Sequence, residues 1–228
     1  MKKFSVIITT ILLLTITNLF MITKSISAAT HFKQAVSVQT LQKEASQRIV
    51  VKSSEKSKTT ASLTRFEKVK GKWIKVGSTV TAVIGKKGVG KAKEGDAKTP
   101  KGTFLLGTSF GWGSAPSGMK YPFRKATKFD YWIDDVKSKD YNKWVTYKGN
   151  PSKKWQSFER LTHELYKYAV VIRYNDRPIV KGKGSAIFLH MKKTNTKYTL
   201  GCVAISEKEI VKVIKWLDAK KKPIIVIE

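Results

Sequence analysis

Cysteine and histidine are scarce in this sequence: it has one cysteine, Cys202, and three histidines, His31, His163 and His190. A single thiol excludes an intramolecular disulfide and any zinc or iron–sulfur site built from several cysteines. So few histidines leave little material for a histidine-rich metal centre, and we expect neither a metal nor a cofactor. The 228 residues are nevertheless 41% hydrophobic and 11% aromatic, which is enough for a packed core. The composition therefore predicts a small globular domain with one free thiol.

Acidic residues are also few, because 16 Asp and Glu stand against 45 Lys and Arg, and the formal net charge is +29. Such a charge attracts polyanions in a strongly salt-dependent way. Only six of the basic residues are arginine, the side chain that best reads bases through its planar fork. The composition thus argues against specific nucleic-acid recognition and favours anionic cell-wall polymers or a lipid surface as partners.

The N-terminal residues 1–29 have the pattern of an export signal. Lys2 and Lys3 precede a largely apolar run over 4–23, and Ser27-Ala28-Ala29 supplies the small residues that a signal peptidase accepts. An uncleaved membrane anchor is the alternative, since an apolar run of about 20 residues can span a bilayer. Either reading predicts a secreted, extracytoplasmic protein associated with the cell wall. Residues 30–47 are polar and are expected to form a tether or a short helix before a domain over 48–228.

The remaining sequence predicts a mainly β fold with one or two helices. Apolar and β-branched runs predict strands at 48–52, 61–69, 72–76, 80–84, 168–174, 186–190 and 224–227. Lys70-Gly71 predicts a tight hairpin turn. Residues 85–118 are expected to be loops around 103–106, and residues 157–166 are expected to form one short helix. A capping box at Ser206-Glu207-Lys208-Glu209 predicts an amphipathic helix that ends before Pro223.

A glycine-rich segment, Gly85 to Lys91, nearly spells a phosphate-binding P-loop after a predicted strand. The next residue of that motif must carry a hydroxyl for magnesium, but here it is Ala92. A helix should also begin there, whereas Gly95 and Pro100 follow and break helices. We therefore reject nucleotide binding.

The chemistry-bearing residues are His190, at the end of a buried-looking strand, and Gly201-Cys202, twelve residues later. A lone cysteine is most often a small buried residue, and a lone histidine is often structural. Three features favour a reactive pair instead. A free thiol is a liability outside the cytoplasm, the positive charge favours a thiolate, and glycine lets a substrate carbonyl approach the backbone.

Two stretches resemble the catalytic motif of the YkuD-type L,D-transpeptidases. They are Gly184-Ser185-Ala186-Ile187-Phe188-Leu189-His190 and Thr199-Leu200-Gly201-Cys202-Val203-Ala204. Residues 93–104, which contain Thr99-Pro100-Lys101-Gly102, and residues 132–142 resemble further segments of the family. The resemblance covers roughly residues 48–228. It implies a single β-sandwich or barrel domain of mixed sheets with one or two peripheral helices.

The family resemblance also implies an activity: cross-linking of peptidoglycan stem peptides, in cell-wall biogenesis and the control of cell shape. Carried over to this sequence, Cys202 is the nucleophile that forms an acyl-enzyme and His190 is the general base. The backbone amides of Cys202 and Gly201 are candidate oxyanion donors. Thr199, where many members have serine, is a candidate substrate-binding residue.

The sequence departs from the commonest form of the motif and thus resembles a divergent branch. Met191 replaces the glycine after the histidine, and Ala204 replaces an arginine two residues after the cysteine. The missing arginine leaves the binding of a substrate carboxylate open, with Lys192 or Lys193 as candidate substitutes.

Two other functions fit the same residues. Water could accept the acyl group, which would make the protein an L,D-carboxypeptidase, or the protein could be a non-catalytic basic module that binds the cell wall. Among the remaining residues, Asp134 and Asp135 could bind a metal or the amine of a stem peptide. Neighbouring residues of a strand point to opposite faces, which argues against a shared metal ion, and we expect a capping or structural role. His163 is expected at the surface, and the aromatic residues of 121–144 are expected in the core rather than on a glycan platform.

Overall fold

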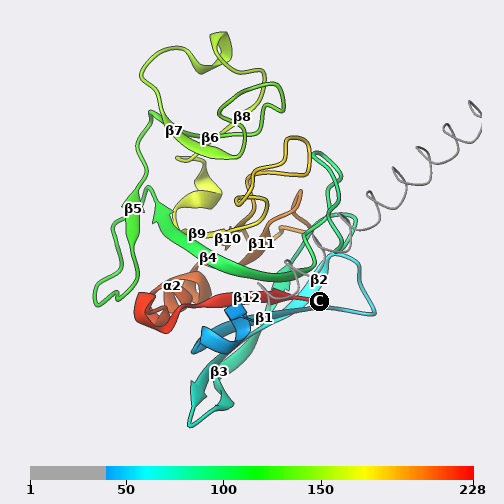
Figure 1. Ribbon diagram of the computed structural model, residues 1–228, viewed down its shortest axis with the longest axis vertical. Coiled ribbons are helices and arrows are strands. Elements are labelled where there is room, and N and C mark those ends of the chain that lie inside the picture. The colour runs from blue at the N-terminus through cyan, green and yellow to red at the C-terminus, as the bar shows by residue number, and fades with distance from the viewer. Residues whose placement is uncertain (1–39) are drawn as a thin grey trace, which may run out of the picture. The chain divides into compact units, whose positions relative to one another are not determined.

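The computed structural model describes residues 40–228, so the export signal predicted at 1–29 and most of the polar segment 30–47 lie outside the described residues. Residues 40–44 are helical, and a compact unit runs from Glu44 to Glu228. This unit consists mainly of strands, as the sequence predicted (Figure 1). Within the described part of the chain, no helix is long and apolar enough to cross a membrane.

A nine-stranded mixed sheet forms the body of the unit. Its strands are β1 (Gln47–Ser53), β2 (Thr60–Val69), β3 (Lys72–Val83), β4 (Gly102–Gly111), β5 (Phe123–Lys125), β9 (Ala169–Ile172), β10 (Phe188–Lys192), β11 (Val203–Ser206) and β12 (Ile224–Ile227). They follow the order β12-β1-β2-β3-β11-β10-β9-β4-β5. Because β12 also pairs with β4, the sheet closes into a barrel, and closure pairs strand edges that would otherwise be open.

The barrel interior follows from the alternation of side chains along its strands. In β1, Ile49 and Val51 point inward and are fully buried, whereas their neighbours are partly exposed. The central parallel pair of β10 and β11 is buried nearly throughout, with Leu189 and Ile205 in the same core. The mainly β, barrel-like fold that the sequence predicted is therefore confirmed.

A second, three-stranded sheet is built from β6 (Asp130–Ile133), β7 (Lys143–Thr146) and β8 (Phe158–Arg160), in the order β7-β6-β8. Figure 1 shows it above the barrel. Tyr131, Ile133 and Trp155 form its own small core. The prediction that aromatic residues of this region are mostly core is thus confirmed for Tyr131 and Tyr141, both almost fully buried.

The short helix predicted over 157–166 is wrong. The segment splits into β8 and a 3-10 helix, η2 (Glu164–Tyr166). Phe158, Glu159 and Arg160 pair with β6, more than 20 residues earlier in the chain. Hydrogen bonds to a distant strand override the local pattern here, and they place the Glu159 side chain close to the barrel.

The hairpin predicted at Lys70-Gly71 is present, and both residues have positive φ, as the tight turn requires. Its second half was predicted as two strands, but β3 is continuous from Lys72 to Val83. The expected break corresponds to a β-bulge, where the register shifts between Leu63 and Arg65 of β2 and where Gly77 has a φ of 68°. A bulge bends a strand without ending it.

Two strands near the nucleophile differ from their predicted bounds. β4 extends through Gly111, well beyond the predicted 103–106, because it pairs with both β12 and β9. β10 begins at Phe188 rather than 186, since Ala186 has a φ of 53° and cannot continue a strand. The strand therefore carries His190 at its centre instead of its end.

The C-terminal helix α2 (Glu207–Trp216) begins where the sequence predicted and buries Ile210, Val213 and Ile214 against the barrel core. The predicted capping box is not formed, because the Ser206 side chain makes no capping hydrogen bond and the Glu209 carboxylate bonds to Lys212. Two further 3-10 turns, η1 (Pro151–Lys153) and η3 (Ala219–Lys221), connect the remaining elements.

Candidate active site

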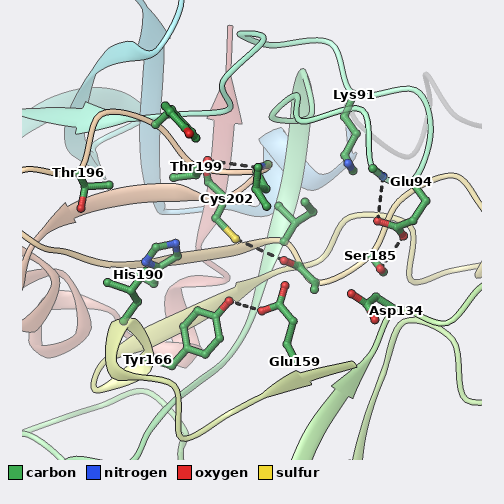
Figure 2. A pocket seen from close by; sticks show the side chains of 17 residues that line it. Lys91, Glu94, Asp134, Glu159, Tyr166, Ser185, His190, Thr196, Thr199 and Cys202 are labelled. Carbon is green, nitrogen blue, oxygen red and sulfur yellow. Dashed lines mark hydrogen bonds between the residues drawn. The ribbon is translucent and has the colours of Figure 1, made fainter. Parts of the chain in front are cut away.

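A cavity of about 360 Å³ opens beside β10 and the start of β11 (Figure 2). Four sequence-predicted site residues line it: Cys202, His190, Gly201 and Thr199. β10 and β11 are adjacent parallel strands, and their register pairs His190 with Ala204. This pairing brings the imidazole and the cysteine that precedes β11 to the same cavity.

The thiol of Cys202 is held by two backbone groups. Its S–H donates to the carbonyl of Ala186 at 3.3 Å, and the amide of Phe188 donates to the sulfur at 3.4 Å. Burial raises the pKa of the Cys202 thiol well above its ordinary value, and the nearby Glu159 carboxyl raises that pKa further. Among the described hydrogen bonds, none joins this sulfur to His190, so the structure shows a resting thiol whose proton points to Ala186.

The imidazole of His190 is oriented by its own strand. Its Nδ1 lies 2.6 Å from the carbonyl of Met191, which can only accept a hydrogen bond. Nδ1 therefore carries the ring proton, and Nε2 has the free lone pair that a general base needs. Burial lowers the pKa of His190 to about 4, so the ring is neutral near pH 7. The residue after the histidine contributes a backbone carbonyl, and Met191 supplies this group as well as a glycine would.

Two threonine hydroxyls fix the loop that carries the nucleophile. Thr199 Oγ1 donates to the carbonyl of Cys202 at 2.6 Å and accepts from the amide of Gly201 at 3.2 Å. Thr99 Oγ1, from a distant loop, donates to the same carbonyl at 3.3 Å. The Gly201 amide is thus occupied within the loop, which leaves the amide of Cys202 as the candidate oxyanion donor. Thr199 binds the backbone in this structure, and its contact with a substrate stays a prediction.

Gly201 itself is required by the backbone. Its φ is 152°, and an added Cβ would lie 3.1 Å from Ile187 Cδ1 and 3.2 Å from the carbonyl of Lys98. A side chain at this position would strain the loop and displace a neighbour. The glycine therefore lets the cysteine loop pack closely on the segment around Lys98.

The carbonyl that accepts the thiol proton is held in an unusual backbone conformation. Ala186 has a φ of 53°, and its amide donates to Oδ1 of the buried Asn142 at 3.2 Å. The same oxygen accepts from Trp132 Nε1, and the Asn142 amide donates to the carbonyls of Tyr174 and Asn175. Asn142 thus ties the small sheet to the cysteine's hydrogen-bond partner.

Three carboxylates line another side of the cavity: Glu94, Asp134 and Glu159 (Figure 2). Glu94 accepts hydrogen bonds from Ser185 and Tyr141, and Glu159 accepts one from Tyr166. Asp134 Oδ1 is buried and has no hydrogen-bond partner. Among residues 40–228, no group of three His, Cys, Asp or Glu side chains is arranged to hold a metal ion. The cavity therefore combines one thiol, one neutral imidazole and an acidic side.

The segment that nearly matched a P-loop forms part of the cavity wall. Gly85 pairs with Thr199, and no helix occurs between residues 85 and 101. An added Cβ at Gly85 would lie 2.6 Å from the carbonyl of Ala97, so this glycine is needed for close packing. Lys91 is buried in an ion pair with Asp96 at 3.0 Å. Gly85 thus serves the packing of this loop.

Several other predicted residues occupy structural or surface positions. Asp135 accepts hydrogen bonds from the amides of Lys137 and Gln156, which is the structural role that the sequence predicted. His163 is exposed at the start of η2, as predicted. Ala204 is fully buried in β11, and Lys193 pairs with Glu164 at the surface. Neither Lys192 nor Lys193 lines the cavity. Among the described residues that do, Lys91 is the one lysine or arginine, and its ammonium group is already paired with Asp96.

Sequence reasoning did not single out Glu159, Tyr166 or Lys91 as site residues. Glu159 and Tyr166 belong to a short strand and the 3-10 turn that follows it, and Lys91 belongs to a glycine-rich loop far earlier in the chain. The one signal that could have pointed to Glu94 and Glu159 as site residues is that acidic residues are rare in this basic sequence.

Comparison with known proteins identifies the family of the chain. A family model described as the L,D-transpeptidase catalytic domain matches residues 46–226, and the chain belongs to this YkuD family. Searching proteins of curated function gives no significant match.

Solved structures give weak fold-level matches. The helical cell shape determining protein Pgp2 (K307A mutant) from Campylobacter jejuni shares 17% identity over 81% of this chain, with a TM-score of 0.42. Bd1075 from Bdellovibrio bacteriovorus shares 17% identity over 79% of this chain, with a TM-score of 0.41. In both cases the match spans 47% of the other chain, so this chain corresponds to about half of their length.

Proposed function

We propose that this protein is an exported cysteine transpeptidase that cross-links peptidoglycan stem peptides through an acyl-enzyme on Cys202. The observation that carries the proposal is the shared cavity of Cys202 and a neutral, oriented His190 in a chain of the L,D-transpeptidase family. A buried thiol and a neutral imidazole can exchange one proton without leaving an uncompensated charge in the resting site.

The first half-reaction removes a terminal D-amino acid from a donor stem. Nε2 of His190 takes the proton of Cys202, and the sulfur attacks the carbonyl that precedes the terminal residue. The amide of Cys202 donates to the developing oxyanion. The C–N bond then breaks, and His190 returns the proton to the departing amine, which leaves a thioester on Cys202. The sulfur must first turn away from Ala186, because the thiol proton is directed there at rest.

The second half-reaction transfers the acyl group to an amine of a neighbouring stem. The neutral amine attacks the thioester carbonyl, and the C–S bond breaks as the new amide bond forms. His190 takes the proton that the amine loses and passes it to the departing sulfur. The acidic side of the cavity supports this step, since Glu94 and Asp134 attract an ammonium group toward Cys202 in a chain that is otherwise strongly positive.

The surface charge supports the location of this chemistry. A net charge of +29 favours residence among anionic polymers of the cell wall, and the family acts on peptidoglycan outside the cytoplasm. Binding to isolated walls should therefore weaken with added salt, whereas thioester formation on Cys202 should persist.

The test uses the intact mass of the protein after exposure to a carbapenem. A cysteine can attack the carbonyl of this β-lactam and open its four-membered ring. We expect one adduct with the mass of the whole drug, and none on Cys202→Ala. Glu164→Gln, a surface variant, is the matched control and should form the adduct. An unmodified wild-type protein would contradict the proposed nucleophile.

A product assay on purified muropeptides separates the related activities. Dimers linked through two third-position residues support transfer, whereas trimmed stems alone would show hydrolysis and make the protein a carboxypeptidase. If Cys202→Ser keeps full activity and high salt abolishes it, the protein is instead a non-catalytic module that binds the cell wall.

A further inference from the structure

Glu159 and Tyr166 connect the acidic side of the cavity to the proposed catalytic pair. The Tyr166 hydroxyl donates to the Glu159 carboxylate, and both residues line the cavity that holds Cys202 (Figure 2). The Tyr166 ring meets the His190 ring edge-on, with centroids 5.5 Å apart and an interplanar angle of 80°. It meets the Phe188 ring in the same way, at 5.4 Å. Glu159 is thus held in place by the side chain that packs on His190.

Two further carboxylates share the cavity with Glu159. The titratable and charged groups that line it are Glu94, Asp134, Glu159, Lys91, Tyr166, Tyr198, His190 and Cys202, and Arg160 and His163 line a neighbouring cavity with Glu159. Lys91 is already neutralised by Asp96, and the buried His190 is neutral near pH 7. Like charges repel one another, so the neighbouring carboxylates Asp134 and Glu94 oppose the ionisation of Glu159.

We propose that Glu159 is a positioning residue that controls the thiol: while it keeps its proton Cys202 can ionise, and once it loses its proton Cys202 is held as the unreactive thiol. This inference rests on the proposed function, because it assigns a role in that same reaction. The structure supports it by geometry, since Glu159 shares the cavity with Cys202 and is fixed there by Tyr166.

The acid–base properties of the two groups agree with the geometry. Burial raises the pKa of Glu159 to about 7, with further increases from Asp134 and Glu94 that the Tyr166 hydrogen bond partly offsets. Ionised Glu159 in turn raises the pKa of the Cys202 thiol. Glu159 therefore changes charge in the pH range in which the thiol must become reactive.

The experiment measures the rate at which iodoacetamide alkylates the purified full-length chain across a range of pH. Cys202 is the single cysteine, so the loss of free thiol reports on this residue alone, and the reagent itself carries no charge. The variant is Glu159→Gln, which keeps the acceptor for Tyr166 and removes the charge. The matched control is Glu164→Gln, on the neighbouring exposed surface.

We expect Glu159→Gln and wild type to react equally below about pH 6, where Glu159 is protonated, and the variant to react roughly tenfold faster above about pH 8. The control should follow wild type throughout. A ratio that is the same at every pH would overturn the proposal, because a purely structural effect does not depend on the charge of Glu159.

Tyr166→Phe gives a second measurement should Glu159→Gln fail to fold by circular dichroism. The phenol favours the ionised carboxylate, so its removal should move the onset of the slow regime to higher pH. An unchanged onset would overturn the proposal. Alkylation needs no peptidoglycan, so these outcomes stay readable even if muropeptide turnover is absent and the proposed function fails.

Discussion

The barrel and the loops around the cavity bury different kinds of groups. In the barrel, inward side chains such as Ile49 and Ile205 are apolar and fully buried. The loops bury polar side chains and contain residues with positive φ, such as Ala186. Thr99 and Asn142 are buried there, and each hydroxyl or amide is satisfied by a backbone partner. Barrel strands tolerate many apolar sequences, because burial of area is non-directional. The loops tolerate few, because each hydrogen bond fixes one geometry. Stability and proposed reactivity therefore depend on different regions.

The largest expected effect is on stability, in the barrel. Ile49→Ala removes a fully buried side chain and should lower the free energy of unfolding by about 2–5 kcal/mol. The alkylation rate of Cys202 per folded molecule should stay unchanged, because the site loops do not depend on this contact. Urea denaturation and iodoacetamide kinetics measure the two quantities. A parallel loss of reactivity in the folded fraction would show that the two regions are coupled.

The next effect concerns the pH dependence of stability through His190. Its pKa is lowered from 6.5 to about 4 in the folded protein, so the unfolded chain binds the extra proton between these values. Stability from this group is complete above about pH 6.5 and is lost as the pH falls toward 4, by about 3 kcal/mol. His190→Gln should flatten this part of the stability curve measured by urea denaturation.

Parallel curves for wild type and His190→Gln would contradict the assignment of a neutral, buried imidazole.

A third comparison sets two glycines of positive φ against each other. Gly201→Ala strains the backbone and crowds Ile187 and Lys98, which should cost about 2 kcal/mol of stability. Displacing the sulfur should also slow carbapenem acylation by about 10²-fold. Gly118→Ala also strains a positive φ, but its Cβ meets nothing within 4 Å, so acylation should stay at the wild-type rate. If the two variants are acylated at the same rate, the close packing at Gly201 does not position the sulfur of Cys202.

The smallest expected effect is that of Thr99→Val, which removes one hydroxyl behind the nucleophile. The carbonyl of Cys202 and the amide of Gly85 each lose a partner, and we expect about 1 kcal/mol of destabilisation with a slower acylation rate. Thr64→Val on the exposed face of β2 is the control, and it should change neither quantity. Urea denaturation measures the stability, and the intact mass over time after carbapenem addition measures the acylation rate. If Thr99→Val changes neither stability nor acylation rate, the Thr199 hydroxyl alone fixes the loop that carries Cys202.

How far the sequence could predict the structure varied with the range of the interactions. The Lys70-Gly71 hairpin and the start of α2 were predicted because their signals lie within a few residues. The segment 157–166 was misread because its strand depends on pairing with β6. The motif around His190 and Cys202 led to two cavity residues, but Glu159 and Tyr166 carry no local signal that separates them from surface residues.

By itself, the sequence determined the mainly β character, the positive charge and the two residues proposed to react, since each depends on composition or on short-range patterns. Only the tertiary structure decided that β12 closes the barrel against β4, that the thiol rests against Ala186, and that three carboxylates line another side of its cavity. The physical reason is that contacts between distant segments depend on how the closed sheet brings them together, and this information is spread over the whole chain.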